Sequence, residues 1–165
     1  PSSAITNLRE REVEETSHDA GAPLAPAPES KDLAALVERF KEAGMPISYE
    51  HLGEPLPNDA NLQLTIYRIA QEALTNVLRY APTTKRITVR LARRVGCAEL
   101  WVINAAAPGS PSMHGSGKGL IGMRERAAVY SGSVQAGPVD GNWQVYAILR
   151  WQEDTLEELK WQLPV

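Results

Sequence analysis

The chain has very little cysteine and no long apolar segment. Cys97 is its only cysteine, so a disulfide framework is excluded and a reducing cytoplasm is expected. No apolar run reaches the roughly 20 residues that a membrane-spanning helix needs, and no signal peptide is recognisable. We therefore expect this segment to work in the cytoplasm, without a membrane contact of its own.

Charge of one sign is equally scarce, and several chemical signatures are missing. The formal net charge is −3 over 165 residues, which does not favour a nucleic-acid or anionic-membrane surface. No histidine–cysteine cluster has the spacing of a zinc site. The segment Gly115-Ser116-Gly117 lacks the G-x-S-x-G pattern of a hydrolase nucleophile. What is present is a 43% hydrophobic composition, which suits one compact domain with extensions.

The first thirty residues differ in composition from the rest of the chain. Residues 7–16 are charged and have the character of a frayed helix end, and residues 21–28 form a linker rich in proline and alanine. His18 precedes this linker and has no apolar helical repeat around it. The last residues form a short amphipathic tail. We divide the chain into residues 1–30, 31–152 and 153–165.

Between these extensions, apolar periodicity predicts three helices and one sheet. The helical patterns cover residues 33–43, 61–81 and 120–128. Alternating patterns predict strands over residues 45–52, 86–92, 98–104, 133–136 and 143–151. Asp140-Gly141 has the composition of a hairpin turn between the last two strands. The predicted fold class is α/β, a two-layer α/β sandwich with a mixed sheet and three main helices.

The helix predicted over residues 61–81 carries two polar side chains one turn apart. Glu72 and Asn76 are four residues apart and therefore share a face, away from the apolar stripe. A carboxylate beside an amide oxygen presents the hard oxygen ligands that Mg²⁺ favours, and this ion takes its other ligands from water and nucleotide phosphates. Asn76 is the better direct ligand, and Glu72 can orient a water or accept a proton. An ordinary polar helix face gives the same pattern.

A glycine-rich turn precedes the helix predicted over residues 120–128. Gly115, Gly117 and Gly119 lie within five residues of one another. Glycines allow backbone N–H groups to approach phosphate oxygens closely, and the start of a helix adds free donors. Lys118 lies among these glycines as a candidate phosphate contact. A flexible linker has a similar composition, but the abrupt start of a helix argues against a simple linker.

Taken together, these segments resemble a known family. Arg68–Ala81 (RIAQEALTNVLRYA) resembles the N box of sensor histidine kinases. Gly117–Ala127 (GKGLIGMRERA) resembles their second glycine box, in the NarL/DesK-type subfamily. The resemblance covers about residues 31–152 and includes the order of helices and strands. It implies the GHKL (Bergerat-type) ATP-binding fold that gyrase and MutL proteins share.

The resemblance also implies a function and a set of site residues. The family transfers the γ-phosphoryl group of ATP to a histidine, with Mg²⁺ as the metal cofactor. In this sequence Asn76 would bind Mg²⁺, and Glu72 would be the catalytic residue that assists attack by the histidine. The other implied ATP contacts are Arg79, Tyr80, Asn104, Gly117, Lys118, Gly119 and Leu120. The accepting histidine belongs in a long amphipathic helix of a dimerisation domain, and His18 does not fit that description.

One residue departs from the family pattern. Where the family has D-x-G-x-G, this chain has Asn104 followed by Ala-Ala-Ala-Pro. An amide oxygen still accepts a hydrogen bond from the amino group of adenine, but without the charge that strengthens it. A loss on the order of 1 kcal/mol follows. We expect ATP binding to be retained and weakened.

Partners and alternatives also follow from the resemblance. The implied partners are the dimerisation and phosphoacceptor domain of the same kinase and a NarL-type response regulator. Because the chain opens on Pro1, we expect a monomeric fragment of a homodimeric, membrane-anchored sensor. Three alternatives stay open: an anti-sigma-factor serine kinase, a degenerate nucleotide-binding module without catalysis, and a pure interaction domain.

Overall fold

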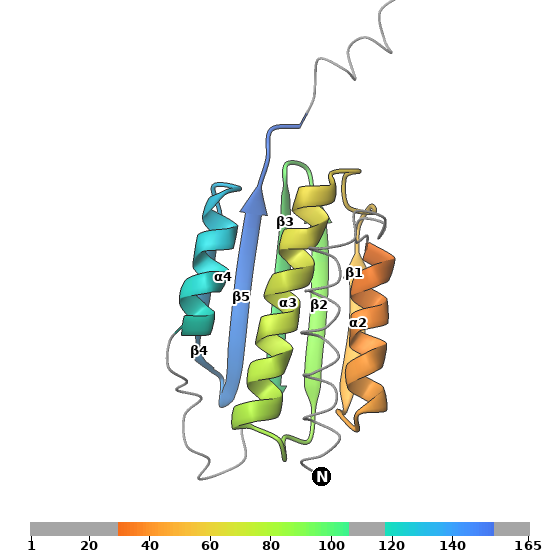
Figure 1. The fold of residues 1–165 in the computed structure, drawn as a ribbon, viewed down its shortest axis with the longest axis vertical. Helices are drawn as coiled ribbons and strands as arrows, with labels where there is room; N and C mark the ends of the chain where they lie inside the picture. Colours follow the sequence, from red (N-terminus) through yellow and green to blue (C-terminus); the bar gives the residue numbers. More distant parts are fainter. Residues whose placement is uncertain (1–29, 106–117, 154–165) are drawn as a thin grey trace, which may run out of the picture.

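The computed structural model describes residues 30–105 and 118–153, which form a sheet covered on one face by helices. Figure 1 shows the three helices of these ranges side by side on the same face of five strands. The elements are α2 (Ser30–Glu42), β1 (Ile47–Leu52), α3 (Ala60–Tyr80), β2 (Ile87–Arg94), β3 (Cys97–Ala105), α4 (Lys118–Ala128), β4 (Ser133–Val139) and β5 (Asn142–Arg150). The predicted two-layer α/β sandwich is therefore confirmed.

The sheet is mixed, as the sequence predicted. Its strand order is β1-β2-β3-β5-β4, with β1 parallel to β2 and every other neighbouring pair antiparallel. The turn between β4 and β5 contains Asp140 and Gly141 with φ of 50° and 80°, the positive angles that a two-residue hairpin favours. The strand β4 continues to Val139, three residues beyond the predicted end at Ala136. Pro138 is tolerated there because β4 is an edge strand.

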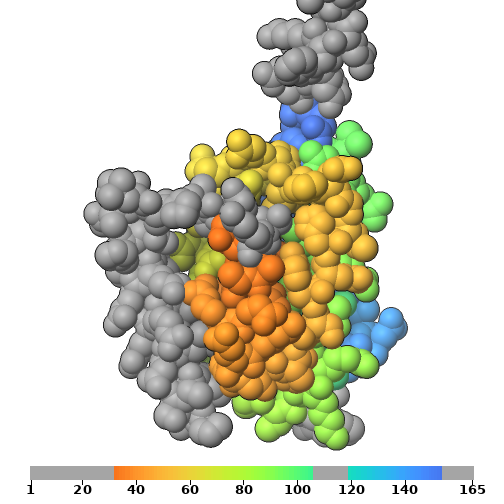
Figure 2. Space-filling model, turned by 90° about the vertical axis from the view of Figure 1, so that its right-hand side faces the viewer, coloured from red at the N-terminus to blue at the C-terminus, as the bar shows by residue number. Residues whose placement is uncertain are grey.

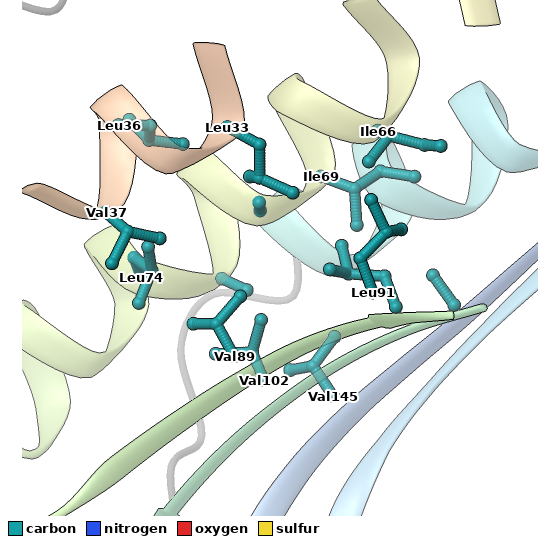
Figure 3. Close-up of a cluster of buried hydrophobic side chains, with 14 of the residues drawn as sticks. Leu33, Leu36, Val37, Ile66, Ile69, Leu74, Val89, Leu91, Val102 and Val145 are labelled. Atoms are coloured by element: carbon teal, nitrogen blue, oxygen red, sulfur yellow. The ribbon is translucent and has the colours of Figure 1, made fainter. Parts of the chain in front are cut away.

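The apolar stripes of the helices meet the inner face of the sheet in one core. In Figure 3, Leu33 of α2 and Ile69 of α3 point toward the strands, and Leu36 and Ile66 belong to the same core. Strand residues at alternate positions fill the other side of this layer, as the pleat requires. The strand members are Ile47, Ile87, Val89, Leu91, Ala98, Leu100, Val102, Val134, Val145, Ala147 and Leu149. This core holds α3 across the middle of the sheet.

The local sequence fixes both ends of α3. The side chain of Asp59 accepts hydrogen bonds from the backbone N–H groups of Asn61 at 3.0 Å and Leu62 at 3.1 Å. These bonds satisfy two of the donors that a helix start leaves unpaired. Pro82 follows the last cap residue, Ala81, and prevents the helix from continuing. The polar face of α3 is thereby placed in a defined register over the sheet.

A glycine ends α2 in a comparable way. Gly44 has φ of 99°, and the N–H of Met45 reaches back to the carbonyl of Phe40 at 3.1 Å. This is the arrangement in which a left-handed residue closes a helix. The strand β1 then begins at Ile47, two residues after the predicted start at Met45. Figure 2 shows α2 and β1 forming the surface at this edge of the domain.

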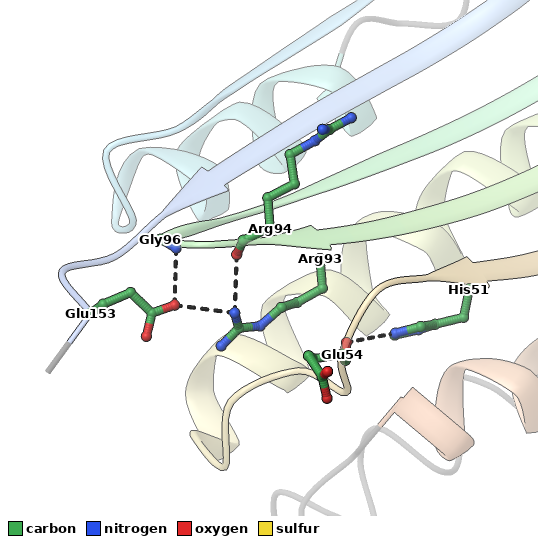
Figure 4. Close-up of polar contacts among 6 residues, drawn as sticks. All are labelled: His51, Glu54, Arg93, Arg94, Gly96 and Glu153. Carbon is green, nitrogen blue, oxygen red and sulfur yellow. Dashed lines mark hydrogen bonds and ion pairs between the residues drawn. The ribbon is translucent and has the colours of Figure 1, made fainter. Parts of the chain in front are cut away.

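Polar contacts tie together the end of the sheet where β5 finishes (Figure 4). The carboxylate of Glu153 accepts a hydrogen bond from the N–H of Gly96 at 2.9 Å and pairs with Arg93 Nη1 at 3.2 Å. The pKa of Glu153 lies below its ordinary value, chiefly because of the bond from Gly96. His51 Nε2 lies 2.8 Å from the carbonyl oxygen of Glu54 in the loop after β1. The chain leaving β5 is therefore anchored to the β2–β3 turn.

Candidate functional site

The structure brings the polar face of α3 against the start of α4. A Cβ atom placed on Gly119 would lie 2.3 Å from Glu72 Oε1 and 3.4 Å from Asn76 Nδ2. Only glycine therefore fits this contact with Glu72 in its present position. The two segments that the sequence singled out, more than 40 residues apart, meet at one point.

Both polar side chains of α3 are partly accessible at this contact. Glu72 and Asn76 are half-buried, and within the described residues no cation forms an ion pair with Glu72. The first residues of α4 carry backbone N–H groups with no partner inside the helix. The contact therefore combines a free carboxylate, an amide and the donor end of a helix, which is a suitable environment for a phosphate–metal group.

The other predicted ATP contacts are distributed around this point. Arg79 and Tyr80 follow Asn76 on the same side of α3, and the Arg79 guanidinium lies 5.7 Å from the centre of the Tyr80 ring. Arg79 is exposed and Tyr80 is half-buried. Lys118 is the first residue of α4 and Leu120 lies half-buried in its first turn, whereas Gly117 falls outside the described residues.

Asn104 lies on the inner face of the sheet, near the end of β3. It continues the row of Ala98, Leu100 and Val102, all of which are buried against the helices. Its side chain is only 2% exposed, and its Oδ1 atom has no hydrogen-bond partner within the described residues. A buried acceptor without a donor costs roughly 1–3 kcal/mol, so a donor from a bound molecule would relieve this cost. The end of β3 and the beginning of α4 lie at the same end of the sheet (Figure 1).

A residue that the sequence analysis missed holds this end of β3 in place. Thr84 is buried, and its hydroxyl lies 2.7 Å from the carbonyl oxygen of Ala105 and 3.3 Å from that of Arg86. The N–H of Ala105 donates to the same Arg86 carbonyl at 2.9 Å. These bonds connect the loop after α3 to the strand that carries Asn104. A threonine in a short polar loop has no distinctive sequence signal, so only the structure reveals this role.

No preformed metal cluster is found among the described residues. Within residues 30–105 and 118–153, no three His, Cys, Asp or Glu side chains converge as metal ligands. A single amide ligand is sufficient for Mg²⁺ only where phosphates and water supply the remaining oxygens. Within the same ranges, no helix is both long and apolar enough to cross a bilayer.

A second polar cluster lies on the outer face of the sheet, which the helices do not cover. The Tyr146 hydroxyl donates to Glu99 Oε2 at 2.5 Å, and Arg94 Nε pairs with Glu99 Oε1 at 2.7 Å. The bond from Tyr146 lowers the pKa of Glu99 most strongly, while burial and the nearby carboxylate raise the pKa of Tyr146 to about 12. The centre of the Trp101 ring lies 5.2 Å from the centre of the Tyr146 ring. These groups satisfy one another.

Solved histidine kinase structures share this arrangement of helices and strands. The chain superposes on the catalytic domain of histidine kinase ThkA with a TM-score of 0.54 and 11% identity, over 73% of this chain and 88% of that one. It superposes on Acinetobacter baumannii histidine kinase AdeS with a TM-score of 0.54 and 13% identity, over 85% and 75% of the two chains. For the histidine kinase domain of the Erythrobacter litoralis EL346 blue-light activated kinase, the TM-score is 0.52 and the identity 12%, over 81% and 67%.

These similarities concern the fold. The sequence matches no family model. The superpositions show that the chain shares the fold of histidine kinase catalytic domains.

Proposed function

We propose that residues 31–152 form the ATP-binding catalytic domain of a sensor histidine kinase. The observation that carries this proposal is the close approach of Gly119 to Glu72 and Asn76. Residues 1–30 would be the end of a dimerisation helix followed by a linker, and residues 153–165 a C-terminal tail. The kinase fold and the two sequence motifs support the same conclusion independently.

Asn76 and Glu72 would have different roles in phosphoryl transfer. The Asn76 amide oxygen would bind Mg²⁺, and this ion, when bound, would neutralise charge on the phosphates. Glu72 would accept a hydrogen bond, or the proton, from the imidazole that attacks the γ-phosphorus. Its carboxylate is available for this role because it forms no ion pair within the described residues.

The start of α4 would hold the phosphates. Backbone N–H groups from Gly117 to Leu120 would donate to phosphate oxygens, with the Lys118 ammonium as an additional charge. Gly119 would do so while packing on Glu72, which places the acceptor side chain and the phosphate donors next to one another. Arg79 and the Tyr80 hydroxyl would contact the phosphates from α3.

Asn104 would recognise the base. Its buried oxygen, which has no hydrogen-bond partner within the described residues, is suited to accept a hydrogen bond from the 6-amino group of adenine. Because the amide is neutral, this bond would be weaker than one to a carboxylate. The neutral residue also favours a second candidate function, a degenerate module that binds nucleotide without transferring phosphate.

The proposed partners follow from the catalytic role. The accepting histidine would come from the dimerisation domain of the same kinase, and the phosphoryl group would pass on to a NarL-type response regulator. The whole kinase would be a membrane-anchored homodimer, with this domain in the cytoplasm. The 165-residue chain by itself would be a monomer.

Calorimetric titration tests the proposal. ADP and a non-hydrolysable ATP analogue would be titrated into the chain with and without Mg²⁺, and again into Asn76→Ala. The matched control is Asn61→Ala, which removes an exposed amide from the other end of the same helix. We expect magnesium-dependent binding that Asn76→Ala weakens by about 100-fold, the upper range for disturbing a metal site. Asn61→Ala should bind normally.

Two outcomes would decide against the proposal. Absence of binding to the folded chain at millimolar nucleotide would leave an interaction domain as the remaining explanation. Equal weakening by Asn76→Ala and Asn61→Ala would show that the effect is not specific to the site. Phosphoryl transfer would then be measured after adding a dimerisation domain, which separates a working kinase from a degenerate module.

A further inference from the structure

We propose that this site accepts 6-oxopurine nucleotides as well as 6-aminopurine nucleotides, and that Asn104 makes this possible. The inference rests on the proposed function, because it concerns the base of the same nucleotide. A carboxylate at position 104 would only accept hydrogen bonds, whereas an amide both donates and accepts. The substrate class is therefore purine nucleoside triphosphates with either a donor or an acceptor at carbon 6.

The position of Asn104 makes the difference between an amide and a carboxylate important. Its neighbours across the sheet are Ile87 on β2 and Trp143 on β5, so backbone pairing fixes it from both sides. The side chain is 98% buried, since its exposed fraction is 2%. In such surroundings an unmet hydrogen-bonding group is more costly than in water. Whichever base binds must therefore match the group that Asn104 presents.

The amide of Asn104 can present either group. Within the described residues no hydrogen bond holds its Oδ1 atom. Rotation by about 180° about the Cβ–Cγ bond exchanges Oδ1 and Nδ2 in almost the same space. In one orientation Oδ1 accepts from the 6-amino group of adenine, and in the other Nδ2 donates to the 6-oxo group of hypoxanthine. An aspartate in the same place would set a charged acceptor against that 6-oxo group.

The backbone around Asn104 restricts the adjustment to this rotation. The Thr84 hydroxyl donates a hydrogen bond to the carbonyl oxygen of the adjacent residue Ala105 at 2.7 Å, and the N–H of Ala105 donates to the carbonyl of Arg86. The strand therefore cannot move away from a mismatched base without breaking bonds to the loop after α3. Base selectivity depends on the chemistry of the side chain at position 104.

The test compares ATP with ITP, which carries a 6-oxo group and lacks the 2-amino group of guanine. Dissociation constants of both magnesium complexes would be measured by calorimetry for the full chain and for Asn104→Asp. We expect the dissociation constants of ATP and ITP for the unmodified chain to agree within about tenfold, because a difference of one hydrogen bond changes affinity by about that factor. Asn104→Asp should bind ATP more tightly and disfavour ITP by about 100-fold or more, because it faces one acceptor with another.

The unmodified chain alone is sufficient to overturn the inference. If the unmodified chain binds ITP about 100-fold more weakly than ATP, Asn104 does not form a hydrogen bond with both bases. A ratio of that size is expected only where a buried polar group is mismatched. Binding of ATP without ITP would thus reject this inference and leave the proposed function intact. Failure of both nucleotides to bind the folded chain would reject both. Thermal unfolding of Asn104→Asp would confirm that the variant is folded before its selectivity is interpreted.

Discussion

The outer-face cluster and the α3–α4 contact present polar groups in opposite ways. On the outer face, Glu99 accepts a hydrogen bond from Tyr146 and forms an ion pair with Arg94, so both of its carboxylate oxygens have partners within the chain. On the inner face of the same strand, the oxygen of Asn104 is buried and has no partner in the described residues. Glu72 beside Gly119 likewise has no ion-pair partner there.

The difference separates groups that stabilise the fold from groups that have no partner within the described residues and that, in the proposed function, would bind the nucleotide. A buried polar group without a partner destabilises the folded chain, whereas a satisfied one is neutral or stabilising. Removing the Asn104 amide should therefore weaken nucleotide binding and stabilise the fold, whereas disrupting the Glu99 cluster should destabilise the fold and leave nucleotide binding unchanged. Four experiments examine this contrast.

The largest effect is expected for Gly119→Ala. The added methyl group would meet Glu72 Oε1 at 2.3 Å, and the flexible Glu72 side chain would turn away. We expect little change in thermal unfolding but a loss of about 100-fold in phosphoryl transfer or magnesium–nucleotide affinity, because the carboxylate and the phosphate donors no longer fit together. Calorimetry and a transfer assay with a dimerisation domain would measure this.

Gly122→Ala is the matched control within the same helix. Its methyl group would meet only the Arg126 side chain, at 3.2 Å, and Arg126 is exposed. Both substitutions remove a glycine from α4, so any gain in helix propensity is shared between them. Equal binding by the two variants would mean that the contact between Gly119 and Glu72 serves packing alone.

The second effect is expected for Asn104→Leu, and it should have opposite signs on stability and binding. Removing the amide, whose Oδ1 atom has no hydrogen-bond partner within the described residues, should raise the free energy of unfolding by about 1–3 kcal/mol and weaken nucleotide binding by about 10- to 100-fold. Gln63→Leu provides the contrast, because Gln63 is also buried but donates to the carbonyl of Pro57 at 2.9 Å. That variant should be destabilised and bind normally. A loss of stability in Asn104→Leu would contradict the distinction.

Much of the fold could be predicted from the sequence because its signals are local. The apolar stripe of α3, its Asp59 cap and Pro82 lie within 24 residues of one another and define one helix. The turn Asp140-Gly141 adopts the positive φ angles that its composition favours. Element ends were less accurate, as β4 shows, because pairing with β5 extends a strand beyond its own apolar pattern.

The site could be predicted only in part, because its decisive features are contacts between distant residues. Spacing placed Glu72 over Asn76, but the fit of Gly119 against them depends on how α4 packs on α3. The burial of the Asn104 oxygen, which has no partner within the described residues, likewise depends on elements far away in the sequence. Thr84 was missed because its bonds to Ala105 and Arg86 form only when the loop meets β3. Sequence reasoning proposed which residues take part in the chemistry, and the tertiary structure shows which of them lack partners within the described residues.

A smaller effect, confined to stability, is expected for Tyr146→Phe. The Tyr146 hydroxyl donates a hydrogen bond to Glu99 at 2.5 Å. Because this bond is charge-assisted, its loss should lower the free energy of unfolding by about 1–2 kcal/mol. Tyr130→Phe is the control, since this half-buried tyrosine lies outside the cluster. Nucleotide affinity should be unchanged in both variants. Weaker binding by Tyr146→Phe would show that the outer face is coupled to the site, and the contrast between the two regions would fail.

The smallest effect concerns the acid side of the stability profile. The pKa of Glu99 is lowered in the folded state, mainly by the bond from Tyr146, so folding favours its charged form. The resulting stabilisation is present above the unfolded pKa of about 4.3 and is lost as the pH falls through the lower folded value. We therefore expect Glu99→Gln to be less stable than the parent at pH 7, with the difference shrinking below about pH 4.3.

Urea unfolding between pH 3 and pH 7 would measure this, with the exposed Glu125→Gln as the control. A difference for Glu99→Gln that stayed constant down to pH 3 would mean that the carboxylate contributes through packing, and that the pairing on the outer face does not stabilise the fold by its charge.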